Sequence, residues 1–301
     1  NGATHRDRGP PSSTPGIPMT LWTALTASVV AVAAAVRSTW SPCGLSMLST
    51  ITPFSERAKG HSYRATAGWF VVGATLGGAT LGGLMALLAL AVQAVPATTA
   101  TTGLVALAAA LVAAASDRGI AGIRLPVHHR QVNERWLDRY RPWVYGAGFG
   151  WQIGTGLATY VTTAAVYLTV VLGALTGRPA VALAVGTGFG FLRGMAVFLT
   201  RDLADPSELW AFHRRFLEVG PVAGRLVIGA ELVSAVAMAA WLRSPAALAV
   251  VGLAALVAGV GAARSARHGA VAAPVCPVPE ATGPAREDLA LTGGARRPAR
   301  P

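Results

Sequence analysis

The sequence predicts an all-α fold: a polytopic membrane helix bundle of six or seven transmembrane helices, arranged as two inverted three-helix repeats. Of its 301 residues, 53% are hydrophobic and 13% are charged, whereas soluble domains carry about 25% charged residues. Apolar windows of about 17–25 residues recur along the chain, and each could cross about 30 Å of hydrocarbon as a helix. These windows lack the alternation of barrel strands, so a helical bundle is favoured.

The transmembrane domain is expected to occupy residues 20–263 and to begin with a span at 20–54 that is interrupted at Pro42. The other predicted spans are residues 65–95, 99–116, 143–171, 179–200, 222–242 and 245–263. The composition of the two tails, 1–19 and 264–301, predicts disorder, and no cleavable signal peptide is expected.

Basic residues gather in alternate connections between the spans, namely residues 55–64, 117–142 and 201–225. The positive-inside rule places these connections in the cytoplasm of a plasma-membrane protein. The N-terminus is then outside and, with seven spans, the C-terminus is cytoplasmic. The same pattern accounts for the net charge of +12, so we expect membrane lipid as a partner and no nucleic acid.

An internal repeat supports this layout. A shift of 112 residues aligns "CGLSMLST" (43–50) with "TGLATYVT" (155–162) and matches Gly44 with Gly156 and Thr50 with Thr162. Each copy has three spans, and an odd number inverts the second copy in the membrane. The predicted parts are repeat one (20–116), a basic loop (117–142), repeat two (143–243) and an extra helix (245–263).

Both repeats contain a helix break. Pro42 and Gly44 interrupt the first span about halfway along, and a run of glycines weakens the fourth span at 146–156. Backbone groups freed within lipid must face protein or water, so paired breaks predict a midplane site for a small solute or ion. The alternative is a pair of kinks whose hydroxyls bond to their own helices. The predicted substrate-binding residues are Pro42, Cys43, Gly44, Ser46, Thr50, Gln152, Gly154, Thr155, Gly156, Thr159 and Thr162.

Three ionisable residues lie within predicted spans: Arg37, Arg193 and Glu231. Charges at such depth are costly unless they are paired or hydrated, so each is a functional candidate. Arg193 continues the face of the glycines in its span, and we predict that it pairs with Glu231, either as a gate or to hold two helices together. Arg37 has an alternative, which is to extend toward the outer interface.

The segment "VVGATLGGATLGG" (71–83) has the spacing of small residues that allows close helix packing. Because no strand or Walker lysine accompanies its glycines, a phosphate-binding loop is excluded. The two cysteines exclude a disulfide scaffold, and His128 and His129 lack further ligands at metal spacing. No metal, cofactor or catalytic residue is predicted, and the chain is not expected to be an enzyme.

The Pro42–Cys43 pair in the first span of a three-plus-three architecture resembles the CcdA/DsbD-type transmembrane electron carriers of the LysE-like exporter superfamily, over about residues 20–243. The resemblance implies a second motif cysteine in the fourth span, and together the two cysteines would shuttle a disulfide. The equivalent position here is Thr155, so Cys43 would need an external thiol. The alternative is that Cys43 is a small buried residue without redox chemistry.

Three hypotheses follow from the sequence. The first is a transporter-like protein that moves a small solute or ion past the paired breaks. The second is a thiol–disulfide carrier in cytochrome c or envelope-protein maturation, in which Cys43 meets a thioredoxin-like partner. The third is a non-catalytic membrane scaffold that docks partners through its basic loops.

Overall fold

The computed structural model describes residues 18–123, 125–126 and 140–269. The chain divides into two compact units, Asn1–Gly259 and Val260–Pro301, and the helix bundle belongs to the first. Most of both predicted tails, and the part of the basic loop that holds His128 and His129, lie outside the described residues. The helices are α1 (Met19–Ser38), α2 (Pro42–Thr50), α3 (Pro53–Ala58), α4 (Tyr63–Ala94), α5 (Thr99–Arg118), η1 (Ile120–Gly122), α7 (Pro142–Gly154), α8 (Ala165–Leu175), α9 (Pro179–Met195), η2 (Ala196–Thr200), α10 (Pro206–Trp241) and α11 (Pro245–Gly269).

The predicted all-α class is confirmed, since no strand occurs in the part of the chain that the structure describes. There, five segments are long and apolar enough to cross a membrane: α1, α4, α5, α9 together with η2, and α10. Helix α8 and the Pro245–Val257 part of α11 are apolar but shorter. These lengths fit a helical membrane bundle, while the count of six or seven spans stays a prediction.

The first predicted interruption is present between α1 and α2. Pro42 occupies the first turn of α2, where its missing N–H removes no hydrogen bond from the helix. The Ser41 hydroxyl caps this helix by accepting the Gly44 N–H at 3.1 Å. Helix α1 has 20 residues, or about 30 Å, and is itself a candidate span. The break therefore follows a complete span, and its predicted position halfway along one is wrong.

The second interruption divides the predicted span 143–171. Helix α7 has 13 residues and ends at Gly154, and helix α8 has 11 residues and begins at Ala165. The segment 155–164 between them contains no helix, and Gly156 takes a φ of 69°, a backbone conformation that favours glycine. Neither half is long enough to cross hydrocarbon alone, so the span is divided. The division begins only at the end of the predicted glycine run 146–156, because residues 146–154 are helical and belong to α7.

Helix α4 packs closely against both α7 and α9 through its small residues. Gly73 and Gly77 face α7, whereas Gly78 and Gly82 face α9. A Cβ atom on Gly78 would lie 2.5 Å from the carbonyl oxygen of Gly186, and one on Gly82 would lie 2.6 Å from that of Leu183. Any larger side chain would push these backbones apart, so the predicted packing role of residues 71–83 is confirmed.

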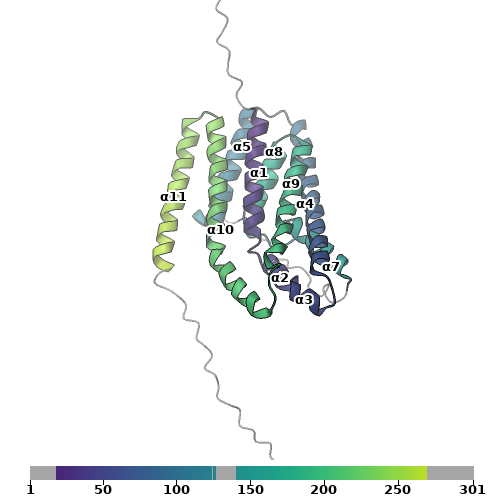
Figure 1. Cartoon of the computed structure of the whole chain (residues 1–301). Helices are drawn as coiled ribbons and strands as arrows, with labels where there is room; N and C mark the ends of the chain where they lie inside the picture. Colours follow the sequence, from purple (N-terminus) through teal and green to yellow (C-terminus); the bar gives the residue numbers. More distant parts are fainter. Residues whose placement is uncertain (1–17, 124, 127–139, 270–301) are drawn as a thin grey trace, which may run out of the picture. The chain divides into compact units, whose positions relative to one another are not determined.

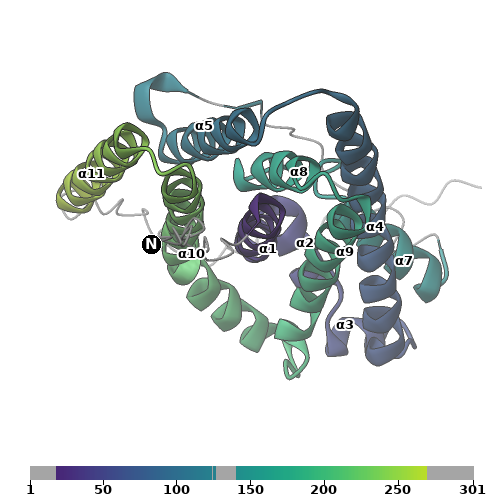
Figure 2. The same cartoon turned by 90° about the horizontal axis from the view of Figure 1, so that it is seen from above.

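The connections of the bundle gather at two ends (Figure 1). Helices α2 and α3 and the first turns of α7 and α10 lie at one end, together with the basic segments that the structure describes there. The α4–α5, α8–α9 and α10–α11 connections lie at the opposite end. Seen from above, α1 lies inside the bundle and contacts α8, α9 and α10 (Figure 2). This alternation is what the predicted orientation requires, and the orientation itself remains a prediction.

Candidate functional site at the two helix breaks

Arg193 of α9 joins the two helix breaks. Its side chain is 2% exposed, and its Nη1 donates to the carbonyl oxygen of Ile153, in the last turn of α7, at 2.8 Å. Its Nη2 donates to the Ser41 hydroxyl, the cap of α2, at 3.5 Å. The Ile153 carbonyl also accepts the Gly156 N–H at 3.1 Å. One guanidinium thus satisfies polar groups that both breaks expose, and the two interruptions meet in space.

The predicted ion pair between Arg193 and Glu231 is wrong. Glu231 of α10 is fully buried, and neither of its carboxyl oxygens has a hydrogen-bond partner among the described residues. Arg193 is directed at the two breaks instead. Helical periodicity predicted that both side chains point into the bundle. Periodicity does not determine which neighbouring helix a buried side chain contacts.

Several of the predicted substrate-binding residues are engaged within their own helices or in packing. The Thr155 hydroxyl donates to the Trp151 carbonyl at 2.7 Å, and the Thr50 hydroxyl donates to the Ser46 carbonyl at 2.8 Å. Gly154 lies against the backbone of α4 at Ala74. For these residues the structure matches the alternative of self-bonded hydroxyls and helix packing.

The other predicted residues differ in surroundings. Pro42, Cys43 and Gly44 form the first turn of α2, where Cys43 is 2% exposed and belongs to an apolar cluster with Met47 and Leu48. Gln152 is half-buried in α7. Thr159 and Thr162 lie in the second break, and their hydroxyl oxygens are shielded from solvent without a hydrogen-bond partner among the described residues.

A polar pocket of about 380 Å³ adjoins the second break. Arg37, near the end of α1, lines it together with the break segment 161–164 and with Gly224 and Ile228 of α10. Thr162 and Arg37 were predicted as site residues, and the pocket brings them together. The remaining lining residues are Ser116, Asp117, Arg118, Gly119, Leu125, Pro126 and Tyr167.

Asp117 shapes this pocket by capping α8 from another helix. One carboxylate oxygen accepts the Ala164 N–H at 2.6 Å, and the other accepts the Thr163 hydroxyl. Asp117 and Thr163 are 46 positions apart in the sequence, and their hydrogen bond holds the end of the second break against α5. Sequence reasoning missed Asp117 because it assigned 117–142 to a basic loop. A lone acid at the end of an apolar span was the available signal.

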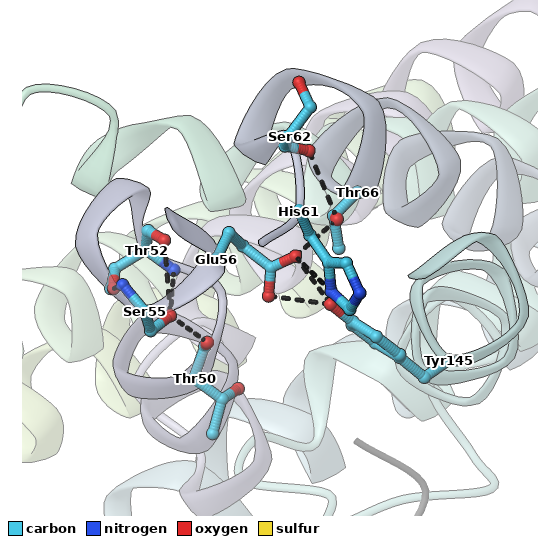
Figure 3. A network of polar contacts seen from close by, with 8 residues as sticks. All are labelled: Thr50, Thr52, Ser55, Glu56, His61, Ser62, Thr66 and Tyr145. Carbon is cyan, nitrogen blue, oxygen red and sulfur yellow. Dashed lines mark hydrogen bonds and ion pairs between the residues drawn. The ribbon is translucent and has the colours of Figure 1, made fainter. Parts of the chain in front are cut away.

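A second group of polar side chains surrounds Glu56 of α3 (Figure 3). The fully buried Glu56 carboxyl accepts hydrogen bonds from the Thr66 hydroxyl at 2.6 Å and from the Tyr145 hydroxyl at 2.7 and 2.6 Å. His61 Nδ1 lies 3.8 Å from the same carboxyl. The group connects α3, α4 and α7, and so links the two predicted repeats.

Sequence reasoning also missed Glu56, which was counted in a basic connection. The local signal was a helix start: Thr52 and Ser55 form a capping box, and Pro53 occupies the first turn of α3. That start turns Glu56 toward the protein, but the Tyr145 partner, 89 residues away, has no sequence signal.

Comparison with known proteins identifies relatives along part of the chain. The methylamine utilization protein MauF of Paracoccus denitrificans is 32% identical over 186 residues, which are 60% of this chain and 64% of the relative. MauF of Paracoccus versutus is 32% identical over 58% of this chain and 64% of its own length. MauF of Methylophilus methylotrophus is 30% identical over 56% and 60%, respectively. This chain therefore spans less than two thirds of these relatives, and no family model or solved structure matches it.

Proposed function

We propose that this chain is a transporter-like membrane protein that serves methylamine utilization. The proposed role is taken from its relatives, which are named methylamine utilization proteins. It holds a small polar solute between its two helix breaks. The observation that carries the proposal is the polar pocket, which Arg37 lines from beside the first break and Thr162 lines from within the second. A site between two interrupted helices is the arrangement that many secondary transporters use.

The proposal includes the layout of two inverted repeats, 20–116 and 143–243, with the basic connections in the cytoplasm. Rocking of one repeat against the other would open the pocket to alternate sides. Arg193 is placed to couple this motion to the breaks, since its guanidinium contacts Ser41 in one repeat and Ile153 in the other. Exchange of these hydrogen bonds would accompany opening.

Complementation tests the biological role. A Paracoccus denitrificans strain that lacks MauF would receive this chain, and growth on methylamine would be measured. We expect growth with the wild type, loss of growth with Arg37→Gln and Thr162→Val, and retention with Thr155→Val, whose hydroxyl bonds to its own helix. Equal growth for all variants, with equal amounts of protein in the membrane, would contradict the site.

Transport is tested separately with the purified chain in proteoliposomes. Electrometric and isotope flux would be followed for a panel of anionic, cationic and neutral small solutes. We expect flux of at least one class above that of empty vesicles, and its loss in Arg193→Gln. No flux for any class, alongside successful complementation, would favour the scaffold hypothesis instead.

One observation favours a second candidate, the thiol–disulfide carrier. Cys43 lies in the first turn of α2, two residues after Ser41, whose hydroxyl accepts a hydrogen bond from the buried Arg193. Thr155 occupies the place of the second motif cysteine, so a thioredoxin-like partner would supply the other thiol. Trapping of mixed disulfides, with Cys43→Ser as control, tests this candidate, and the absence of any Cys43-dependent adduct removes it.

A further inference from the structure

The polar pocket is lined by two arginines. Arg37 of α1 and Arg118, the last residue of α5, both belong to its lining. Among the lining residues that the structure describes, Asp117 supplies the single carboxylate. The formal charge of the lining is therefore positive.

The carboxylate is engaged in hydrogen bonds with the protein; it also attracts Arg37 electrostatically, but without an ion pair at close range. Both oxygens of Asp117 accept hydrogen bonds that cap α8. No described residue forms an ion pair within 4.0 Å with either Arg37 or Arg118. The Nη2 atom of Arg118 is shielded from solvent and has no hydrogen-bond partner in the described ranges. A buried cationic donor without an acceptor costs free energy that a bound anion would recover.

A third donor completes the set. The hydroxyl of Thr162, shielded from solvent and without a partner among the described residues, belongs to the same lining. Guanidinium groups present paired N–H donors in the geometry of carboxylate and phosphate oxygens, and a hydroxyl adds one directional bond. The volume of about 380 Å³ suits a small metabolite rather than a macromolecule.

We propose that this pocket binds a small oxyanion, a carboxylate or a phosphate, between Arg37 and Arg118, with Thr162 as the third donor. The inference deepens the proposed function, because it names the charge class of the solute. The oxyanion could be a free anion from water or the phosphate of a lipid headgroup. The binding experiment distinguishes these two sources.

Binding is measured on the full chain in an uncharged detergent. Sodium phosphate, sodium acetate and the anionic lipid phosphatidylglycerol are titrated separately at constant ionic strength, with sodium chloride as the reference, and thermal unfolding and calorimetry report binding. We expect saturable binding of at least one oxyanion probe. Loss of a hydrogen bond to a charged group weakens binding by about tenfold or more, so Arg37→Gln and Arg118→Gln should each show that loss.

Two further sets of variants serve as controls. Arg57→Gln removes an exposed arginine of α3 that does not line the pocket and should leave the affinity within about twofold of wild type. Arg37→Lys and Arg118→Lys keep the charge and should bind more tightly than the glutamine variants. Unchanged elution and a cooperative melting transition identify variants that fold.

The outcomes separate this inference from the proposed function. Binding of phosphatidylglycerol alone supports the oxyanion site and assigns a lipid headgroup to it. Failure of every oxyanion probe to bind, or equal affinity in wild type and both glutamine variants, overturns the inference. If complementation and flux succeed without anion binding, only this inference fails; if anions bind without any flux, only the transport proposal fails.

Discussion

Replacement of Tyr145 by phenylalanine tests whether the buried Glu56 carboxyl stabilises the bundle. Tyr145→Phe keeps the ring and removes only the hydroxyl that donates to both Glu56 oxygens, at 2.7 and 2.6 Å. The carboxyl keeps its hydrogen bond from Thr66. The change therefore removes one donor from a fully buried acceptor and leaves the packing nearly intact.

The magnitude follows from the charge of the acceptor and from its burial. A hydrogen bond to an ionised group contributes about 1.5–3 kcal/mol, and a typical neutral bond contributes about 0.5–1.5 kcal/mol. Tyr167 offers a matched control, because its hydroxyl donates to the neutral carbonyl of Pro126 at 2.7 Å near the surface. We expect Tyr145→Phe to lower the free energy of unfolding by about 1 kcal/mol more than Tyr167→Phe.

Reversible unfolding in mixed micelles would measure both variants. A double-mutant cycle with Glu56→Gln adds the decisive comparison, since residues in contact show coupling energies of about 0.5–3 kcal/mol. Equal losses for the two tyrosine variants, together with additivity of Tyr145→Phe and Glu56→Gln, would refute the reasoning, because the network would then contribute no more than an ordinary surface bond.

Three other predictions concern packing, burial and charge. Gly190→Ala should lower the free energy of unfolding by about 1–3 kcal/mol, because the added Cβ would lie 2.5 Å from the Cα atom of Gly78. Gly188 has open space around it, so Gly188→Ala should leave the free energy of unfolding unchanged. Equal losses in the two variants would contradict the close packing of α4 and α9. Glu231→Gln should be neutral or stabilising in the same assay, since it replaces a buried carboxyl without a described partner by a neutral group of similar shape. A loss above about 3 kcal/mol would instead indicate a lost ion pair. Hydrogen bonds from the Ser207 hydroxyl and then the Glu208 N–H lower the pKa of Asp205 below its ordinary 3.8. The wild type should therefore be more stable than Asp205→Ala at neutral pH, and this difference should disappear as the pH falls below about 4. A difference in melting temperature that does not change with pH would contradict this prediction.

The local features of this protein could be predicted because local rules govern them. Apolar runs predicted helices, since a chain in lipid must satisfy its own backbone groups. Proline at 42 predicted the first break, because its ring cannot continue a helix from the preceding turn. The glycines of 71–83 predicted close packing, and Gly73, Gly77, Gly78 and Gly82 lie against the backbone of a neighbouring helix, whereas Gly83 faces open space.

The partners of the buried polar groups could not be predicted in the same way. Arg193 was correctly placed on an inward face, yet it contacts the helix breaks rather than Glu231. Asp117 and Glu56 were assigned to basic connections, although each accepts hydrogen bonds from residues 46 or more positions away. No periodicity within a single helix carries information about which distant segment will lie opposite.

The sequence by itself thus determined the all-helical class, the two interruptions and the small-residue faces, because each depends on the backbone chemistry of neighbouring residues. Only the tertiary structure decided that the breaks meet at Arg193, and that Arg37, Arg118 and Thr162 line one pocket. The reason is physical: burial makes a lone polar group costly wherever it lies, but the group that relieves this cost is selected by the packing of whole helices.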